Sequence, residues 1–79
     1  MKYYEAVGIR LNELLKEKGI TKKEIARKTE ISYRCVLRIS KGQSSRISLV
    51  RFYQICKAIE IPPDVFFDSP LFDFGKLEK

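Results

Sequence analysis

The stretch ITKKEIARKTEISYRCVLRISKG, residues 20–42, contains the start and end signals of two short helices. Thr21 and Glu24 have the spacing of a capping box, in which each side chain accepts the backbone N–H of the other residue. Ser32 is a second N-cap residue, and Gly42 suits the left-handed conformation that ends a helix. The pattern predicts two short helices joined by a turn of only a few residues.

Helical patterns continue on both sides of this stretch. Before it, apolar residues recur at helical spacing from Tyr4 to Lys18, and Gly19 follows a basic last turn. After it, Ser48 is expected to cap a helix that runs to about Ile59. The expected inward stripe of that helix is Leu49, Phe52, Ile55, Cys56 and Ile59. Pro62 and Pro63 then predict a short final helix, with Phe66 packing back.

The net charge of +6 is unevenly distributed along the 79 residues. Residues 1–59 contain 14 basic and 5 acidic side chains, whereas residues 60–79 contain 2 basic and 5 acidic ones. This asymmetry indicates a basic face that suits a polyanion and a separate acidic end. No apolar run approaches the ~20 residues that span a bilayer, so no membrane association is expected.

The content of cysteine and histidine argues against catalysis and metal binding. Cys35 and Cys56 are the two cysteines, and there is no histidine, so neither a four-ligand zinc site nor a histidine general base is available. We expect no enzyme activity, no metal and no cofactor, and two small core or half-buried cysteines. The N-terminal sequence lacks the apolar block of an export signal, which predicts a cytoplasmic location and disfavours a disulfide.

The spacing of apolar, capping and glycine positions over residues 7–67 resembles the Cro and lambda-type phage repressor family, also called XRE-like regulators. The residues that carry the resemblance are Gly19 to Ala26, Ile31, Ser32, Val36, Ile39 and Gly42, followed by Ser48, Leu49, Phe52, Ile55, Cys56, Ala58, Ile59, Val65 and Phe66. The resemblance implies an all-α, five-helix lambda-repressor-like domain whose second and third helices form a helix-turn-helix motif. It also implies binding to double-stranded DNA, usually as a dimer.

Transferring the family's roles position by position identifies the expected DNA contacts. The expected base-reading residues are Tyr33, Arg34 and Arg38, on the outward side of the third helix. An arginine can form a bidentate contact to guanine, which discriminates by about 1–3 kcal/mol. The expected contacts to the DNA backbone are Lys22, Lys23, Ser32, Lys41, Ser44 and Arg46. We therefore expect a sequence-specific transcriptional regulator, most simply a repressor.

Four positions depart from the pattern of the family. One is Leu37, which stands where a small polar residue usually lies against DNA. The turn between the second and third helices often contains a glycine where this chain has Glu30, so a differently shaped turn is expected. A helix-one arginine and a helix-three glutamate that commonly form an ion pair are replaced by Leu15 and Ser40. Both charges are absent together, which avoids leaving one of them buried and unpaired.

Two questions stay open at the level of the sequence. The boundaries predict a DNA-binding domain at 1–68 and an apolar, acidic tail at 69–79. This tail either contributes to a homodimer or folds back over its own chain, and the candidate dimer contacts are Phe67, Leu71, Phe72 and Phe74. The alternative function is an antitoxin- or antirepressor-like protein-interaction module on the same fold, because a fold alone does not fix function.

Overall fold

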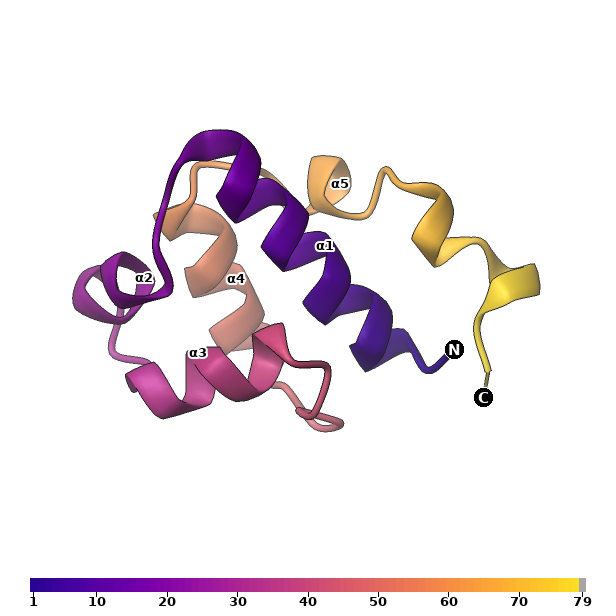
Figure 1. Cartoon of the computed structure of the whole chain (residues 1–79), viewed down its shortest axis with the longest axis horizontal. Coiled ribbons are helices and arrows are strands. Elements are labelled where there is room, and N and C mark those ends of the chain that lie inside the picture. Colours follow the sequence, from indigo (N-terminus) through magenta and orange to yellow (C-terminus); the bar gives the residue numbers. More distant parts are fainter. Residues whose placement is uncertain (79) are drawn as a thin grey trace.

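The computed structural model describes residues 1–78, which form α-helices and short 3₁₀ turns (Figure 1). The elements in chain order are α1 (Tyr3–Lys18), α2 (Lys22–Lys28), α3 (Tyr33–Ser40), α4 (Leu49–Ala58), α5 (Pro63–Phe66) and the 3₁₀ turns η1 (Pro70–Phe72) and η2 (Phe74–Lys76). Within residues 1–78 there is no strand, and Lys2 and Glu78 form an isolated bridge. The prediction of an all-α fold with five helices is confirmed.

The helices begin and end at the residues that the sequence marks. The hydroxyls of Thr21, Ser32 and Ser48 each accept the backbone N–H three residues later, at 3.1–3.2 Å. The carboxylate of Glu24 accepts the Thr21 N–H at 3.3 Å and completes the capping box. Gly42 has a φ of 71° directly after the last turn of α3. Local side-chain chemistry therefore fixes the boundaries of α2, α3 and α4.

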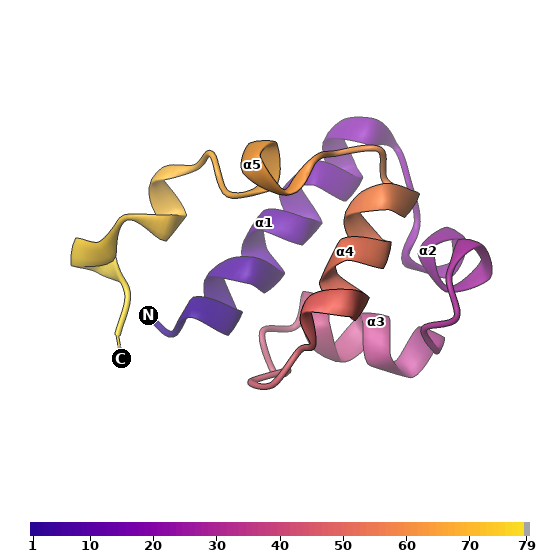
Figure 2. The same cartoon turned by 180° about the vertical axis from the view of Figure 1, so that it is seen from behind.

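The core lies where α1, α3 and α4 meet, with α2 and α5 covering its two ends (Figures 1 and 2). Its most deeply buried large side chains include Leu11, Ile25, Ile55 and Phe66. One predicted core residue is wrong, because Leu49 is 81% exposed. It belongs to the first turn of α4, at the edge of the apolar stripe, where it lines open hollows instead of the core.

The C-terminal tail folds back over its own chain. The N-terminal ammonium of Met1 donates to the carbonyl of Lys76 at 2.9 Å, and the N–H of Glu78 donates to the Met1 carbonyl at 2.7 Å. The ring of Phe72 lies 4.8 Å from that of Phe67, whereas Phe74 is 92% exposed. Met1 and the tail up to Glu78 thus lie at the side of the molecule away from α2 (Figure 1). Lys79, the last residue of the predicted tail, lies outside the described residues.

The loop after α4 contains a backbone feature that the sequence did not suggest. Glu60 has a φ of 58° and is the only non-glycine residue at positive φ among residues 1–78. The ammonium of Lys18 donates to the carbonyls of Ile59 and Glu60 at 2.9 and 3.3 Å, which satisfies the end of α4. None of the described helices is long and apolar enough to cross a membrane.

Candidate nucleic-acid interface

The C-terminal end of α3 is held against α1 by an unusually close approach of two backbones. A Cβ atom added to Gly8 would lie 2.7 Å from the carbonyl oxygen of Ile39 and 2.8 Å from the nitrogen of Gly42. The amide of Asn12 also donates to the carbonyl of Ser40 at 2.8 Å. Glycine at position 8 therefore sets the distance between α1 and α3, a role that the sequence analysis missed.

The N-terminal end of α3 is held by the turn that follows α2. The hydroxyl of Thr29 donates to the carbonyl of Ile25 at 2.8 Å and accepts the N–H of Ile31 at 3.1 Å. Glu30 does not adopt a positive φ. Glu30 therefore does not adopt the left-handed conformation for which a glycine is suited, and the Thr29 side chain links the end of α2 to the start of α3.

Burial divides α3 into an inner and an outer side. Val36 and Ile39 are 0% and 3% exposed and pack in the core, as the spacing predicts. Tyr33, Arg34 and Arg38 are exposed on the remaining surface. Anchored at both ends and buried along one side, α3 presents these three side chains to solvent as a fixed set.

The first group of basic and aromatic side chains joins α2 to the start of α3. The ammonium of Lys23 lies 5.9 Å from the centroid of the Tyr33 ring, within the range of a cation–π contact. Lys22 is half-buried at the first position of α2, and Ser32 is exposed with its hydroxyl engaged in the N-cap of α3. The structure therefore brings Lys23 and Tyr33 together across the turn.

The second group lies between the end of α3 and the start of α4. Arg38 and Arg46 line a hollow of about 290 Å³ together with Arg51, and Cys35, Ser44 and Ser45 complete its lining. The guanidinium of Arg51 lies 3.6 Å from the sulfur of Cys35. Three cationic side chains therefore line one hollow, which has room for an oxyanion such as a phosphate group.

Arg51 was missed from the sequence, although a signal for it was present. It lies three residues after the N-cap Ser48, in the first turn of α4, where a basic residue opposes the helix dipole and has no benefit for helix stability. The loop that precedes it is fixed by the hydroxyl of Tyr3, which donates to the carbonyl of Ser45 at 2.6 Å. Lys41, another predicted backbone contact, is exposed at the C-cap of α3.

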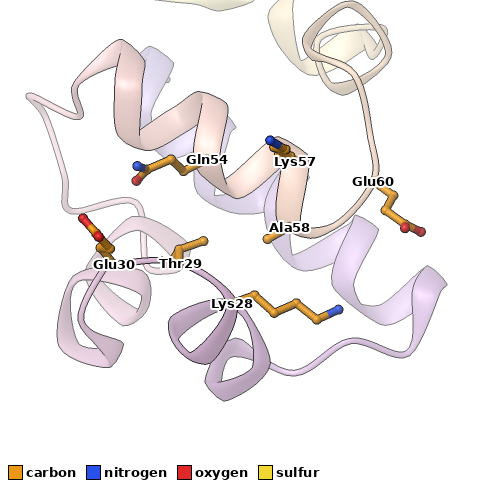
Figure 3. Close-up of a pocket in the computed structure, with 7 residues that line it drawn as sticks. All are labelled: Lys28, Thr29, Glu30, Gln54, Lys57, Ala58 and Glu60. Atoms are coloured by element: carbon orange, nitrogen blue, oxygen red, sulfur yellow. The ribbon is translucent and has the colours of Figure 1, made fainter.

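The segment that contributes most of these residues is predominantly basic. From Thr21 to Arg46 there are eight basic and two acidic residues. One of the acidic residues, Glu24, is engaged in the cap of α2. The other, Glu30, borders a hollow of about 650 Å³ between α2 and α4, which Figure 3 shows with lysine and glutamate side chains of both signs around it. Because basic and acidic side chains both line that hollow, it does not have the positive lining that an anion site needs.

The two residues that replace the family's ion pair are both buried. Leu15 and Ser40 are each 5% exposed, and the Ser40 hydroxyl donates to the carbonyl of Leu37 at 2.8 Å. Throughout the described chain, every buried side-chain nitrogen or oxygen has a hydrogen-bond partner. An apolar and a neutral polar residue thus occupy these places without leaving a charge in the core.

The two thiols differ in their surroundings. Cys35 is half-buried beside Arg51, and Cys56 is buried in the core. Desolvation by burial raises the pKa of the Cys56 thiol from 9.0 to about 11. Both cysteines are free, as expected for small core or half-buried residues. Cys35 is therefore the thiol that lies at the candidate interface.

Comparison with protein families agrees with this geometry. A model of the Cro/C1-type HTH DNA-binding domain matches residues 10–67. The match begins within α1, includes α2, α3 and α4, and ends directly after α5. No curated protein and no solved structure matches the chain.

Proposed function

The chain belongs to the Cro/C1-type helix-turn-helix DNA-binding family, and on that premise we propose that it is a sequence-specific transcriptional repressor. In this proposal α3 inserts into the major groove of double-stranded DNA. The groove is about 12 Å wide and admits a single α-helix. The observation that carries the proposal is the exposed set Tyr33, Arg34 and Arg38 on a helix that α1 and α2 hold rigidly.

We assign base contacts and backbone contacts to different side chains. Arg34 and Arg38 read base edges, because a guanidinium pairs with both acceptors of guanine, and Tyr33 adds an aromatic contact. The proposed backbone contacts are Lys22, Lys23, Ser32, Lys41, Ser44 and Arg46, to which we add Arg51. Contacts to phosphates fix the register of the helix on the duplex, and contacts to bases select the sequence.

We propose that the protein acts as a homodimer in the cytoplasm and has no catalytic activity. A single domain of this size buries too little DNA surface for high specificity. Two copies related by a two-fold axis read two half-sites and double the number of contacts. Bound over a promoter, such a dimer blocks access of the polymerase.

A protein-interaction module on the same fold is the weaker candidate. Eight basic residues against two acidic ones between Thr21 and Arg46 favour a polyanion over a generic protein surface. Charged residues are depleted in the centres of protein–protein interfaces. The protein-interaction alternative would require a partner protein with a strongly acidic surface.

Selection of bound duplexes from a random pool tests the proposal. We expect enrichment of a two-fold-related sequence whose half-sites lie 10–10.5 base pairs apart, or a multiple of that spacing. The Lys16→Ala variant is the matched control, because Lys16 is an exposed basic residue of α1 outside the proposed contacts. It should select the same sequence. A pool that stays random after repeated rounds would contradict sequence-specific binding, and unchanged transcription from a promoter that overlaps the selected site would contradict repression.

A further inference from the structure

Apolar side chains gather on the solvent-exposed side of α4. Leu49, Val50 and Tyr53 are 81%, 67% and 56% exposed, and Phe67 next to them is 44% exposed. Single exposed apolar residues are ordinary, but a contiguous group of this size on a small domain marks a contact surface. We call these four residues the α4 patch.

The α4 patch has the shape of a ridge between two hollows. One hollow, of about 560 Å³, lies between the start of α4 and the tail, and the other, of about 440 Å³, lies towards Pro63. Leu49, Phe52 and Phe67 line both of them. The second hollow is lined by apolar and aromatic residues alone. The protruding Leu49 side chain therefore stands beside hollows that have ample room for another leucine.

The tail of the same chain does not cover this ridge. It is tied to the N-terminus by the hydrogen bonds of Met1 with Lys76 and Glu78. Phe74 of the tail borders the larger hollow but remains 92% exposed. Apolar surface is thus left on both sides of Leu49 after the described chain has folded.

We propose that a second copy of this chain docks on the α4 patch about a two-fold axis, with Leu49 of each copy inserted into a hollow of the other. A two-fold contact requires a surface that is complementary to itself, and a knob beside a hole meets this requirement. The exposed parts of the patch and Phe74 amount to on the order of 700 Å² of side-chain surface. A standard stable interface buries about 800 Å² from each partner.

The position of the α4 patch also suits DNA binding by a dimer, and this part of the inference rests on the proposed function. Leu49 and Val50 follow the loop that contains Ser44 and Arg46, at the end of α4 nearest the C-terminal end of α3 (Figure 2). A two-fold axis through this patch brings the α3–α4 loops of two copies close together. The arginine-lined hollows of both copies then flank the axis, where one stretch of DNA backbone can contact them.

Sedimentation velocity without DNA tests the docking separately from DNA binding. We expect the wild-type protein at tens of micromolar to sediment with twice the 9.2 kDa mass of one chain. Leu49→Asp should raise the dissociation constant of the dimer by about 100- to 1,000-fold, because the two-fold axis places the substitution in the interface twice. Val50→Asp is a second variant of the same surface. Ile9→Asp is the matched control, because Ile9 is 42% exposed on α1, outside the patch, and its dimer should persist.

Three results would overturn the docking proposal. The first is that the wild-type protein sediments as a monomer. The second is that the Leu49→Asp or the Val50→Asp variant dimerises as strongly as the wild type. The third is that Phe74→Ser dissociates the dimer while Leu49→Asp has no effect. The last result would assign the contact to the tail. Duplex binding by the wild type is measured independently, so a monomer that still binds DNA refutes this contact alone. A dimer that binds no DNA refutes the proposed function alone.

Discussion

Replacing Gly8 with alanine tests how α1 positions α3, the helix that we propose enters the major groove. The new Cβ would lie 2.7 Å from the carbonyl oxygen of Ile39, 2.8 Å from the nitrogen of Gly42 and 3.0 Å from the carbonyl oxygen of Ser40. All three are backbone atoms, which cannot rotate away as a flexible side chain does. To restore ordinary contact distances, the end of α3 must move by about 0.5–1 Å.

The expected free energy combines two opposing effects. Alanine in place of glycine inside a helix stabilises by about 1 kcal/mol. Overpacking against fixed neighbours costs about 1–3 kcal/mol, and three backbone contacts place this site at or above the upper end. We therefore expect a net loss of about 2 kcal/mol in the free energy of unfolding, which lowers Tm by roughly 8–16 °C in a domain of this size.

Urea and thermal denaturation followed by circular dichroism measure this loss. Gly75→Ala is the matched control, because the added Cβ would lie 3.5 Å from an Asp73 side-chain oxygen, an ordinary contact, and we expect a change within about 0.5 kcal/mol. Under conditions where Gly8→Ala is fully folded, its affinity for a selected duplex should also fall, since α3 is displaced. A Gly8→Ala variant as stable as the wild type would refute the view that this contact is close-packed and fixes α3.

Three further predictions concern the turn, the core thiol and the DNA contacts. Thr29→Val should destabilise by about 1–3 kcal/mol in denaturant titrations, because a turn N–H loses its acceptor, and Thr29→Ser should restore most of the stability. Because the pKa of Cys56 is raised in the folded protein, its thiol ionises at a lower pH in the unfolded chain than in the folded one. The stabilisation from the buried neutral thiol is therefore fully present below pH 9, and the free energy of unfolding falls by about 2–3 kcal/mol towards pH 11. The stability difference between the wild type and Cys56→Ala should narrow accordingly, and a constant difference would contradict this origin. In competition assays, Arg34→Ala and Arg38→Ala should reduce the difference in affinity between preferred and other duplexes. Lys22→Ala should instead weaken binding to all duplexes about equally. An unchanged preferred sequence in the arginine variants would contradict base reading.

The parts of the fold that depend on local chemistry could be predicted from the sequence. Thr21, Ser32 and Ser48 cap helices with hydroxyls that act within three residues, so their roles are visible without any tertiary information. The inward positions Val36 and Ile39 follow from helical spacing in the same way. These residues decide where α2, α3 and α4 begin and which side of α3 faces the core.

The parts that depend on distant neighbours could not be predicted in this way. Leu49 has the spacing of a core residue, but its exposure depends on where other helices end. The role of Gly8 arises from the backbone of α3, more than thirty residues later. Arg51 joins Arg38 only after the α3–α4 loop has folded. The roles of the individual site residues in DNA binding stay predictions, for which the structure supplies positions and exposures.

The salt dependence of binding to a duplex tests the central claim, contact of the basic α2–α3 side with DNA, most directly. Each neutralised phosphate releases counterions, so the affinity must fall steeply as salt rises. For a dimer with about three or four phosphate contacts in each copy, raising the salt from about 50 to 200 mM should weaken binding roughly 10³-fold or more. Fluorescence anisotropy with a labelled selected duplex provides the measurement. The account predicts this steep decline, and an affinity independent of salt, or no binding to duplex DNA at low salt, would contradict it.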